Sequence, residues 1–290
     1  MISACFVVII GMTVVVVWAV TRAHRAARRK TLMKAPFPEE WSAILSKNLP
    51  PYSSLPGGLL DQLHGYINVF LDEKDFEGCG GQEITDEVRV TIAAQACLLL
   101  VGRDSKCYPR LRSVLVYPHT YVGGKGGIFG AGDEQPSARL GESWRTGAVV
   151  LSWDSVRGGA ANFDDGHNVA LHEFAHQLDQ EDGAADGTPI LRGLSSYRSW
   201  ARSLTEEYKS FLKRVKAHRK TVIDEYGATN PAEFFATATE AFFEKPEQLA
   251  KKRPDLYAEL KSYYRIDPTE WSSTGGVSLA EALRAQSEEI

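Results

Sequence analysis

Apolar residues recur every three or four positions in three segments of the chain, and this spacing predicts helices at 59–71, 85–101 and 197–220. Thr85 stands at the start of the second helix and is of a residue type that caps helix N-termini. The apolar stretch 90–101 within that helix is too short to cross a bilayer. We therefore expect this helix to lie in the core of the protein.

Two shorter segments have the composition of β-strands. Leu111–Tyr117 and Ala148–Trp153 are rich in β-branched and aromatic residues. The glycine-rich segment 123–132 lies between them, and its glycines fit neither the dinucleotide-binding spacing nor a Walker A loop, since Lys125 is followed by glycine. We expect a mobile loop there. The helices and strands together predict one folded domain over 36–270.

The N-terminus has a different pattern. Ile2–Val20 holds no charged residue and would span roughly 28 Å as a helix, close to the thickness of a hydrocarbon core. Basic residues follow the stretch instead of preceding it, which favours an uncleaved anchor over a secretory signal. The sequence thus predicts a transmembrane anchor at 1–21 in the inner plasma membrane and a basic juxtamembrane linker at 22–35. The domain would lie in the cytoplasm, and a polar tail would occupy 271–290.

Composition and charge exclude some classes of function for this chain. The chain has 43% hydrophobic and 24% charged residues, as globular proteins do. Six of its 33 Lys and Arg residues, and none of its 37 Asp and Glu residues, lie in 1–34, so the rest of the chain is strongly acidic. An acidic body predicts no direct nucleic-acid binding. Four cysteines without a CxxC pair favour neither a disulfide scaffold nor a thiolate zinc site.

The clearest chemical signal is the sequence His172-Glu173-Phe174-Ala175-His176. Residues four apart on a helix project from one face, so both imidazoles can bind one Zn²⁺ ion. Glu173 follows the first histidine and can accept a proton from a water activated by the metal. The same five-residue pattern also occurs by chance in ordinary helices, but here it follows a predicted strand on a well-bounded helix.

The bounds of that helix can be inferred from its flanks. Asp164 or Asp165 is expected to cap its N-terminus, and Gly183 is expected to end it. Asp179 falls on the histidine face and is a candidate to orient a ligand imidazole. His167, before the helix, is expected in a loop.

A third protein ligand is needed, and three acids compete for the role. Asp182 has the spacing of a long zinc motif, but that motif requires glycine at position 179 and a downstream methionine, and both are missing. Glu233 and Glu240 remain. Both lie on one stripe with Thr237 in the apolar segment 230–243, which suggests an inward-facing site.

Glu233 also has a purely structural explanation. Asn230 is expected to be the N-cap by its residue type, Pro231 suits the first helical position, and Glu233 then stands where a capping-box glutamate reaches back to the cap. The residues alone leave the choice between Glu233 and Glu240 open.

Three segments, 139–153, 164–179 and 230–243, resemble the Mlc titration factor A family of zinc metallopeptidases. The resemblance implies an α+β, gluzincin-like fold, mostly helical with a small mixed sheet, similar to the catalytic domain of anthrax lethal factor. It also implies one Zn²⁺ per chain, held by the ligands His172, His176 and Glu233. Glu173 would be the general base, and Tyr226, seven residues before the ligand glutamate, would stabilise the oxyanion.

The resemblance further implies what the protein acts on. The expected activity is hydrolysis of peptide bonds in a peptide or protein substrate, with an aminopeptidase as the narrower expectation. The alternative is a membrane-tethered regulatory module that binds a transcriptional repressor. The expected partners are therefore the substrate, the lipid bilayer and, under the alternative, the repressor.

Overall fold

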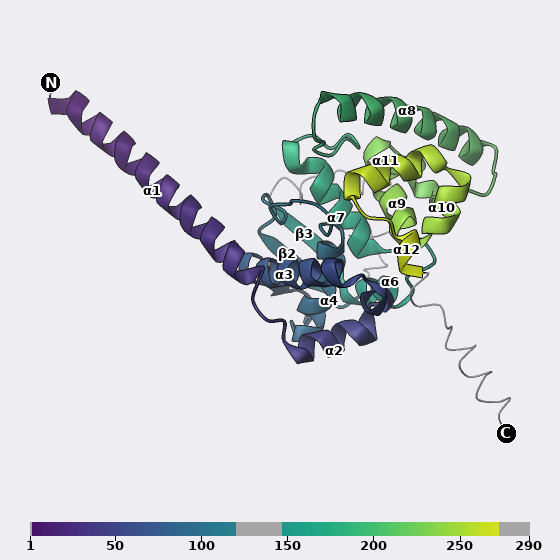
Figure 1. The fold of residues 1–290 in the computed structure, drawn as a ribbon, viewed down its shortest axis with the longest axis horizontal. Helices are drawn as coiled ribbons and strands as arrows, with labels where there is room; N and C mark the ends of the chain where they lie inside the picture. Colours follow the sequence, from purple (N-terminus) through teal and green to yellow (C-terminus); the bar gives the residue numbers. More distant parts are fainter. Residues whose placement is uncertain (1, 120–146, 273–290) are drawn as a thin grey trace.

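The computed structural model describes residues 2–119 and 147–272, with side chains from residue 11 onward (Figure 1). The glycine-rich segment 123–132 and nearly all of the predicted tail lie outside the described residues. The helices are α1 (Ile2–Leu32), α2 (Glu39–Asn48), α3 (Gly57–Glu73), α4 (Asp86–Leu98), α6 (Trp153–Ala161), α7 (Val169–Asp179), α8 (Leu194–Lys216), α9 (Pro231–Glu244), α10 (Pro246–Lys252), α11 (Pro254–Tyr264) and α12 (Thr269–Ser272). The strands are β1 (Asp75–Gly78), β2 (Ser113–Tyr117) and β3 (Ala148–Ser152), and the 3₁₀ segments are η1 (Pro50–Ser54), η2 (Gln180–Asp182) and η3 (Glu225–Ala228).

Helix α1 projects away from the rest of the protein (Figure 1). Its C-terminal part is joined to α3 by two ion pairs, Arg28 with Asp72 and Arg29 with Glu73. Within the described residues, no helix has the length and apolarity that crossing a bilayer requires. The predicted anchor at 1–21 is thus not supported, and most of the predicted linker continues the same helix.

The sheet has the order β1-β2-β3, and all three strands are parallel. Within the described residues, the sheet is thus parallel and not mixed as expected. Strand β1 has the sequence DFEG, which carries none of the β-branched residues that identified the other two, so the sequence pattern missed it. Helix α4 connects β1 to β2, as parallel pairing requires.

Helix α4 lies in the core, as expected. Its residues from Val90 to Leu98 are all buried, and Thr85 caps it by accepting a hydrogen bond from the Val88 N–H. The helix ends at Leu98 instead of continuing to residue 101. It contacts α3 on one side and α7 on another, so it supports the helix that carries the histidines.

The C-terminal half is an assembly of helices (Figure 1). Helix α9 is buried from Ala232 to Glu244 and packs against α7, while α8 lies outside it beside α11. Four aromatic residues of α9 contribute to this packing, namely Phe234, Phe235, Phe242 and Phe243. Because α7 and α9 lie side by side in the core, side chains that face the interface between them are shielded from water.

Candidate metal centre

Helix α7 begins one turn later than its acidic flank predicts. The cap is Asn168, whose Oδ1 accepts a hydrogen bond from the Leu171 N–H at 3.0 Å. Asp165 instead accepts from the His167 N–H in the preceding turn. At the other end, η2 follows α7 directly and Gly183 ends it with φ 105°, a left-handed conformation that favours glycine.

Helix α9 begins as its sequence predicts. Asn230 accepts a hydrogen bond from the Glu233 N–H at 3.0 Å, and Pro231 occupies the first turn. The Glu233 carboxylate does not turn back to Asn230 to complete a capping box. It points across to α7, where it meets the two histidines.

Three donor atoms from the two helices form a small triangle. Glu233 Oε2 lies 3.0 Å from His172 Nε2 and 3.3 Å from His176 Nε2, and the two Nε2 atoms are 3.2 Å apart. Ligands bound to zinc at ~2.0–2.1 Å in a tetrahedron are separated by about 3.3 Å. The triangle therefore has the dimensions of one face of a zinc coordination tetrahedron.

The site is largely shielded from water, and this affects its protonation. Burial raises the pKa of Glu233, but hydrogen bonds with His172 and His176 outweigh it and lower the pKa to about 2. Burial lowers the pKa of His176 below its usual value. Burial also lowers the pKa of His172, but hydrogen bonds with Glu233 and Glu240 outweigh it and raise the pKa. Glu233 and His176 therefore favour the forms that bind a cation, whereas His172 would release a proton on binding one.

Glu240, the rival third acid, has a different position. Its Oε1 accepts a hydrogen bond from His172 Nδ1 at 2.7 Å, and its Oε2 accepts from the Asn168 N–H at 2.6 Å. Glu240 thus contacts the far side of the imidazole from the donor triangle. It fixes the His172 tautomer with Nε2 facing the triangle. The sequence places Glu233 and Glu240 on one stripe and so makes both acids candidates. It does not show which of them joins the donor triangle and which orients the imidazole.

Asp179 does not orient an imidazole, contrary to expectation. The side chain is fully buried, and its Oδ2 accepts a hydrogen bond from the Gly187 N–H at 3.0 Å. It therefore ties the end of α7 to the loop that follows. Burial raises the pKa of Asp179 to about 7. His167 lies in a loop with an exposed side chain, as expected, and its Nδ1 is 3.5 Å from Asp224 Oδ2.

Glu173 and Tyr226 both lie close to the triangle. Glu173 is buried in α7, and its charge contributes to raising the pKa values of His172 and Tyr226. Tyr226 lies in η3, with its ring centroid 6.0 Å from that of His172. Burial first, then the charges of Glu233 and Glu173, raise its pKa to about 12. Tyr226 is 45% exposed, so the site reaches the surface on this side.

The chain was compared with known proteins. Residues 23–265 match the model of the family described as glucose-regulated metallo-peptidase M90. The chain belongs to this family. An uncharacterized protein of Synechocystis sp. is 42% identical over 83% of this chain and 89% of its own length. Mlc titration factor A of Serratia proteamaculans is 30% identical over 79% and 87%, and that of Klebsiella pneumoniae 31% identical over 69% and 76%.

Membership in the M90 family confirms the resemblance inferred from the sequence motifs. It indicates a metallopeptidase and implies a divalent metal. Among the described residues, His172, His176 and Glu233 are the one group of histidine, cysteine and acidic side chains whose donor atoms come close enough to share an ion. The fold thus brings together the two histidines of the motif and the glutamate that the family resemblance implies.

Proposed function

We propose that this protein hydrolyses peptide bonds with a single zinc ion held by His172, His176 and Glu233. The observation that supports the proposal best is the donor triangle, whose edges of 3.0–3.3 Å suit a tetrahedral ion. Two imidazole nitrogens and one carboxylate oxygen are typical donors of a catalytic zinc site, which keeps its fourth position for water or substrate. When bound, the ion would supply Lewis acidity to a water molecule and to the substrate carbonyl.

Glu173 is the proposed general base. Its carboxylate follows His172 on α7 and lies in a buried setting, where a charged acceptor interacts strongly with a nearby proton donor. In the proposed step, Glu173 accepts a proton from the attacking water as the water oxygen bonds to the carbonyl carbon. The same carboxyl group then returns the proton to the departing amine nitrogen.

Tyr226 is the proposed oxyanion donor. With a pKa of about 12 its hydroxyl keeps its proton at neutral pH and can donate a hydrogen bond. Its partly exposed position beside His172 suits a group that meets substrate at the entrance of the site. A donor aimed at the developing negative charge would stabilise the tetrahedral transition state.

The test is the Glu173→Gln variant. We expect it to retain one zinc ion per chain by elemental analysis and to lose cleavage of a peptide library, because glutamine keeps the shape but cannot accept the proton. Glu247→Gln on α10, an exposed glutamate far along the chain, is the matched control and should remain active. Full activity in the Glu173→Gln variant would refute the mechanism.

An aminopeptidase is the narrower proposal, and it rests on the family resemblance alone. Peptides with free and with acetylated N-termini separate the two modes of cleavage. We expect a free N-terminus to be required, and equal cleavage of both peptides would indicate an endopeptidase.

The relatives named Mlc titration factor A support a regulatory partner as a further proposal, since their name refers to Mlc. Capture of Mlc by the Glu173→Gln variant would separate this role from hydrolysis. If the variant loses both capture and cleavage, the two roles share one site.

A further inference from the structure

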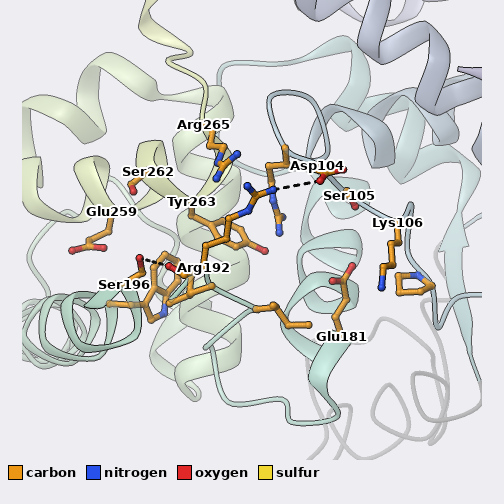
Figure 2. Close-up of a pocket in the computed structure, with 15 residues that line it drawn as sticks. Asp104, Ser105, Lys106, Glu181, Arg192, Ser196, Glu259, Ser262, Tyr263 and Arg265 are labelled. Atoms are coloured by element: carbon orange, nitrogen blue, oxygen red, sulfur yellow. Dashed lines mark hydrogen bonds and ion pairs between the residues drawn. The ribbon is translucent and has the colours of Figure 1, made fainter. Parts of the chain in front are cut away.

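A cavity lies beyond the C-terminal end of α7 (Figure 2). Its volume is about 560 Å³, within the range of small-molecule sites. It is formed by the loop after α4, by η2, by the loop before α8 and by the end of α11. None of the three donors of the metal centre lines it, so its occupant does not depend on the proposed peptidase activity.

Positive charge converges on this cavity from three separate segments. Arg103 comes from the loop after α4. Lys106 comes from the same loop, Arg192 from the loop before α8, and Arg265 from the end of α11 (Figure 2). The protein as a whole carries a net charge of −4, so such a gathering of cations is local. Arginine presents a planar fork of donors that suits carboxylate and phosphate groups.

Most of the acids around the cavity are already engaged. Asp104 forms an ion pair with Arg192 at 3.7 Å, and Glu259 accepts hydrogen bonds from Ser199 and Ser203. Within the described residues, no ion pair involves Lys106, Arg103 or Arg265. Glu181 interacts with the charges of Arg103 and Lys106 but pairs directly with neither, so both cations and Arg265 can still contact an incoming anion.

Three buried atoms at the cavity lack a hydrogen-bond partner in the described part of the chain. They are Nη1 of Arg103, Oε1 of Glu181 and the hydroxyl oxygen of Tyr263. The Arg103 guanidinium is fixed over the ring of Tyr263, with 4.0 Å from Cζ to the ring centroid. A buried polar atom without a partner is unfavourable, and a ligand group can supply the missing partner. Burial also raises the pKa of Glu181, so it accepts or donates a hydrogen bond at modest cost.

The cavity also has apolar walls. Ile190, Leu191 and Trp200 line it beside the charged groups. A bare inorganic ion would leave this surface and most of the volume unused. The complementary ligand is therefore organic, with an anionic group at the arginines and a hydroxyl within reach of Glu181.

We propose that this cavity binds a small hydroxylated organic anion, either a phosphate ester or a carboxylate. The loop that borders it is tied to α7 by the Gly187 N–H, which donates to Asp179, and to α8 by the Gly187 carbonyl, which accepts from Trp200 Nε1. Ligand contacts at Glu181 and Arg192 would hold both ends of this loop. Binding would therefore order residues 180–193.

Isothermal titration of the full chain at low ionic strength tests the proposal. The probes are glucose 6-phosphate for phosphate esters, citrate for carboxylates, glucose as the neutral analogue and inorganic phosphate. We expect one of the two organic anions to bind and glucose not to bind. The Lys106→Gln/Arg265→Gln double variant should weaken binding by about tenfold or more. Both residues are exposed, so the variant should fold.

The matched control is the Arg202→Gln/Lys216→Gln double variant on α8, which removes the same charge outside the cavity and should bind as the unaltered protein does. Hydrogen exchange should show protection of 180–193 on binding. Failure of both organic anions to bind, undiminished binding in the first double variant, or inorganic phosphate binding as tightly as the organic anion would each overturn the proposal.

Discussion

At the scale of single residues, the centre depends on acids that perform different tasks on one imidazole. His172 faces Glu233 through Nε2 and Glu240 through Nδ1, at 3.0 Å and 2.7 Å. The contact with Glu233 is one edge of the donor triangle, and the contact with Glu240 fixes the orientation of the ring. Helical spacing predicts that both acids share a face, but not which nitrogen each one meets.

Replacing Glu240 with glutamine should weaken metal binding. The amide cannot accept from both His172 Nδ1–H and the Asn168 N–H, so the imidazole loses its fixed orientation, and such losses lower metal affinity about 10–100-fold. Competition with a zinc chelator measures the change.

Glu244→Gln, one turn further along α9, is the control for this variant. Burial raises the pKa of Glu244 to about 8, so the group is mostly neutral at pH 7 and the substitution changes little charge. An unchanged zinc affinity in Glu240→Gln would show that Glu240 does not position the imidazole.

Replacing Tyr226 with phenylalanine should impair turnover without loss of metal. Removal of one oxyanion donor typically lowers kcat by about 10²–10³-fold. The measurement is kcat alongside zinc content, with Tyr208→Phe as a control tyrosine that hydrogen-bonds the Ala228 carbonyl outside the centre. A normal kcat in the Tyr226→Phe variant would show that the tyrosine is a packing residue and not the oxyanion donor.

At the scale of elements, caps and helix ends decide how the donors are presented. Asn168 and Asn230 start α7 and α9 with the same side-chain contact to the third residue beyond each cap. Asp179 ends α7 by holding Gly187, so the following loop returns against the helix. The sequence pattern identifies Asn230, but near α7 it favours Asp164 or Asp165, since a single sequence offers several acceptable caps.

The Asp179→Asn variant should change how stability depends on pH. The folded-state pKa of about 7 exceeds the ordinary value of 3.8, so the folded protein binds the proton more tightly and stability falls as pH rises between those values. Asparagine keeps the acceptor for Gly187 and does not ionise, so the variant should gain stability over the native chain from about pH 4 to about pH 7.

Urea unfolding at several pH values measures this difference. Asp164→Asn is the control, because it makes the same substitution at an exposed aspartate outside α7. A constant difference between Asp179→Asn and the native chain across this range would mean that Asp179 ionises with an ordinary pKa.

At the scale of the whole molecule, the centre is a junction between two parts of the chain. The parallel sheet and α4 support α7, whereas α8 and α11 enclose α9. Two residues of the donor triangle lie on α7 and one lies on α9, so a bound cation would link the two parts of the chain. The predicted α+β architecture is observed, with a parallel sheet in place of a mixed one.

Removal of the metal should therefore lower global stability as well as activity. A ligand that binds only the folded state at 1,000 times its dissociation constant contributes about 4 kcal/mol. We expect a chelator to lower the Tm and abolish cleavage, and added Zn²⁺ to restore both. The His176→Ala variant should show neither response. A chelator that left the Tm and the activity of the native chain unchanged would contradict a zinc-linked fold.

The sequence by itself determined the histidine helix, the capped helix of 230–243 and the family, because spacing and capping act between residues close in the chain. The tertiary structure alone decided which glutamate faces both imidazoles, where Asp179 points and how the strands are oriented. These features depend on how α7 lies against α9 and on the pairing of strands far apart in sequence. Such contacts are set by packing of the whole core, which no local pattern encodes.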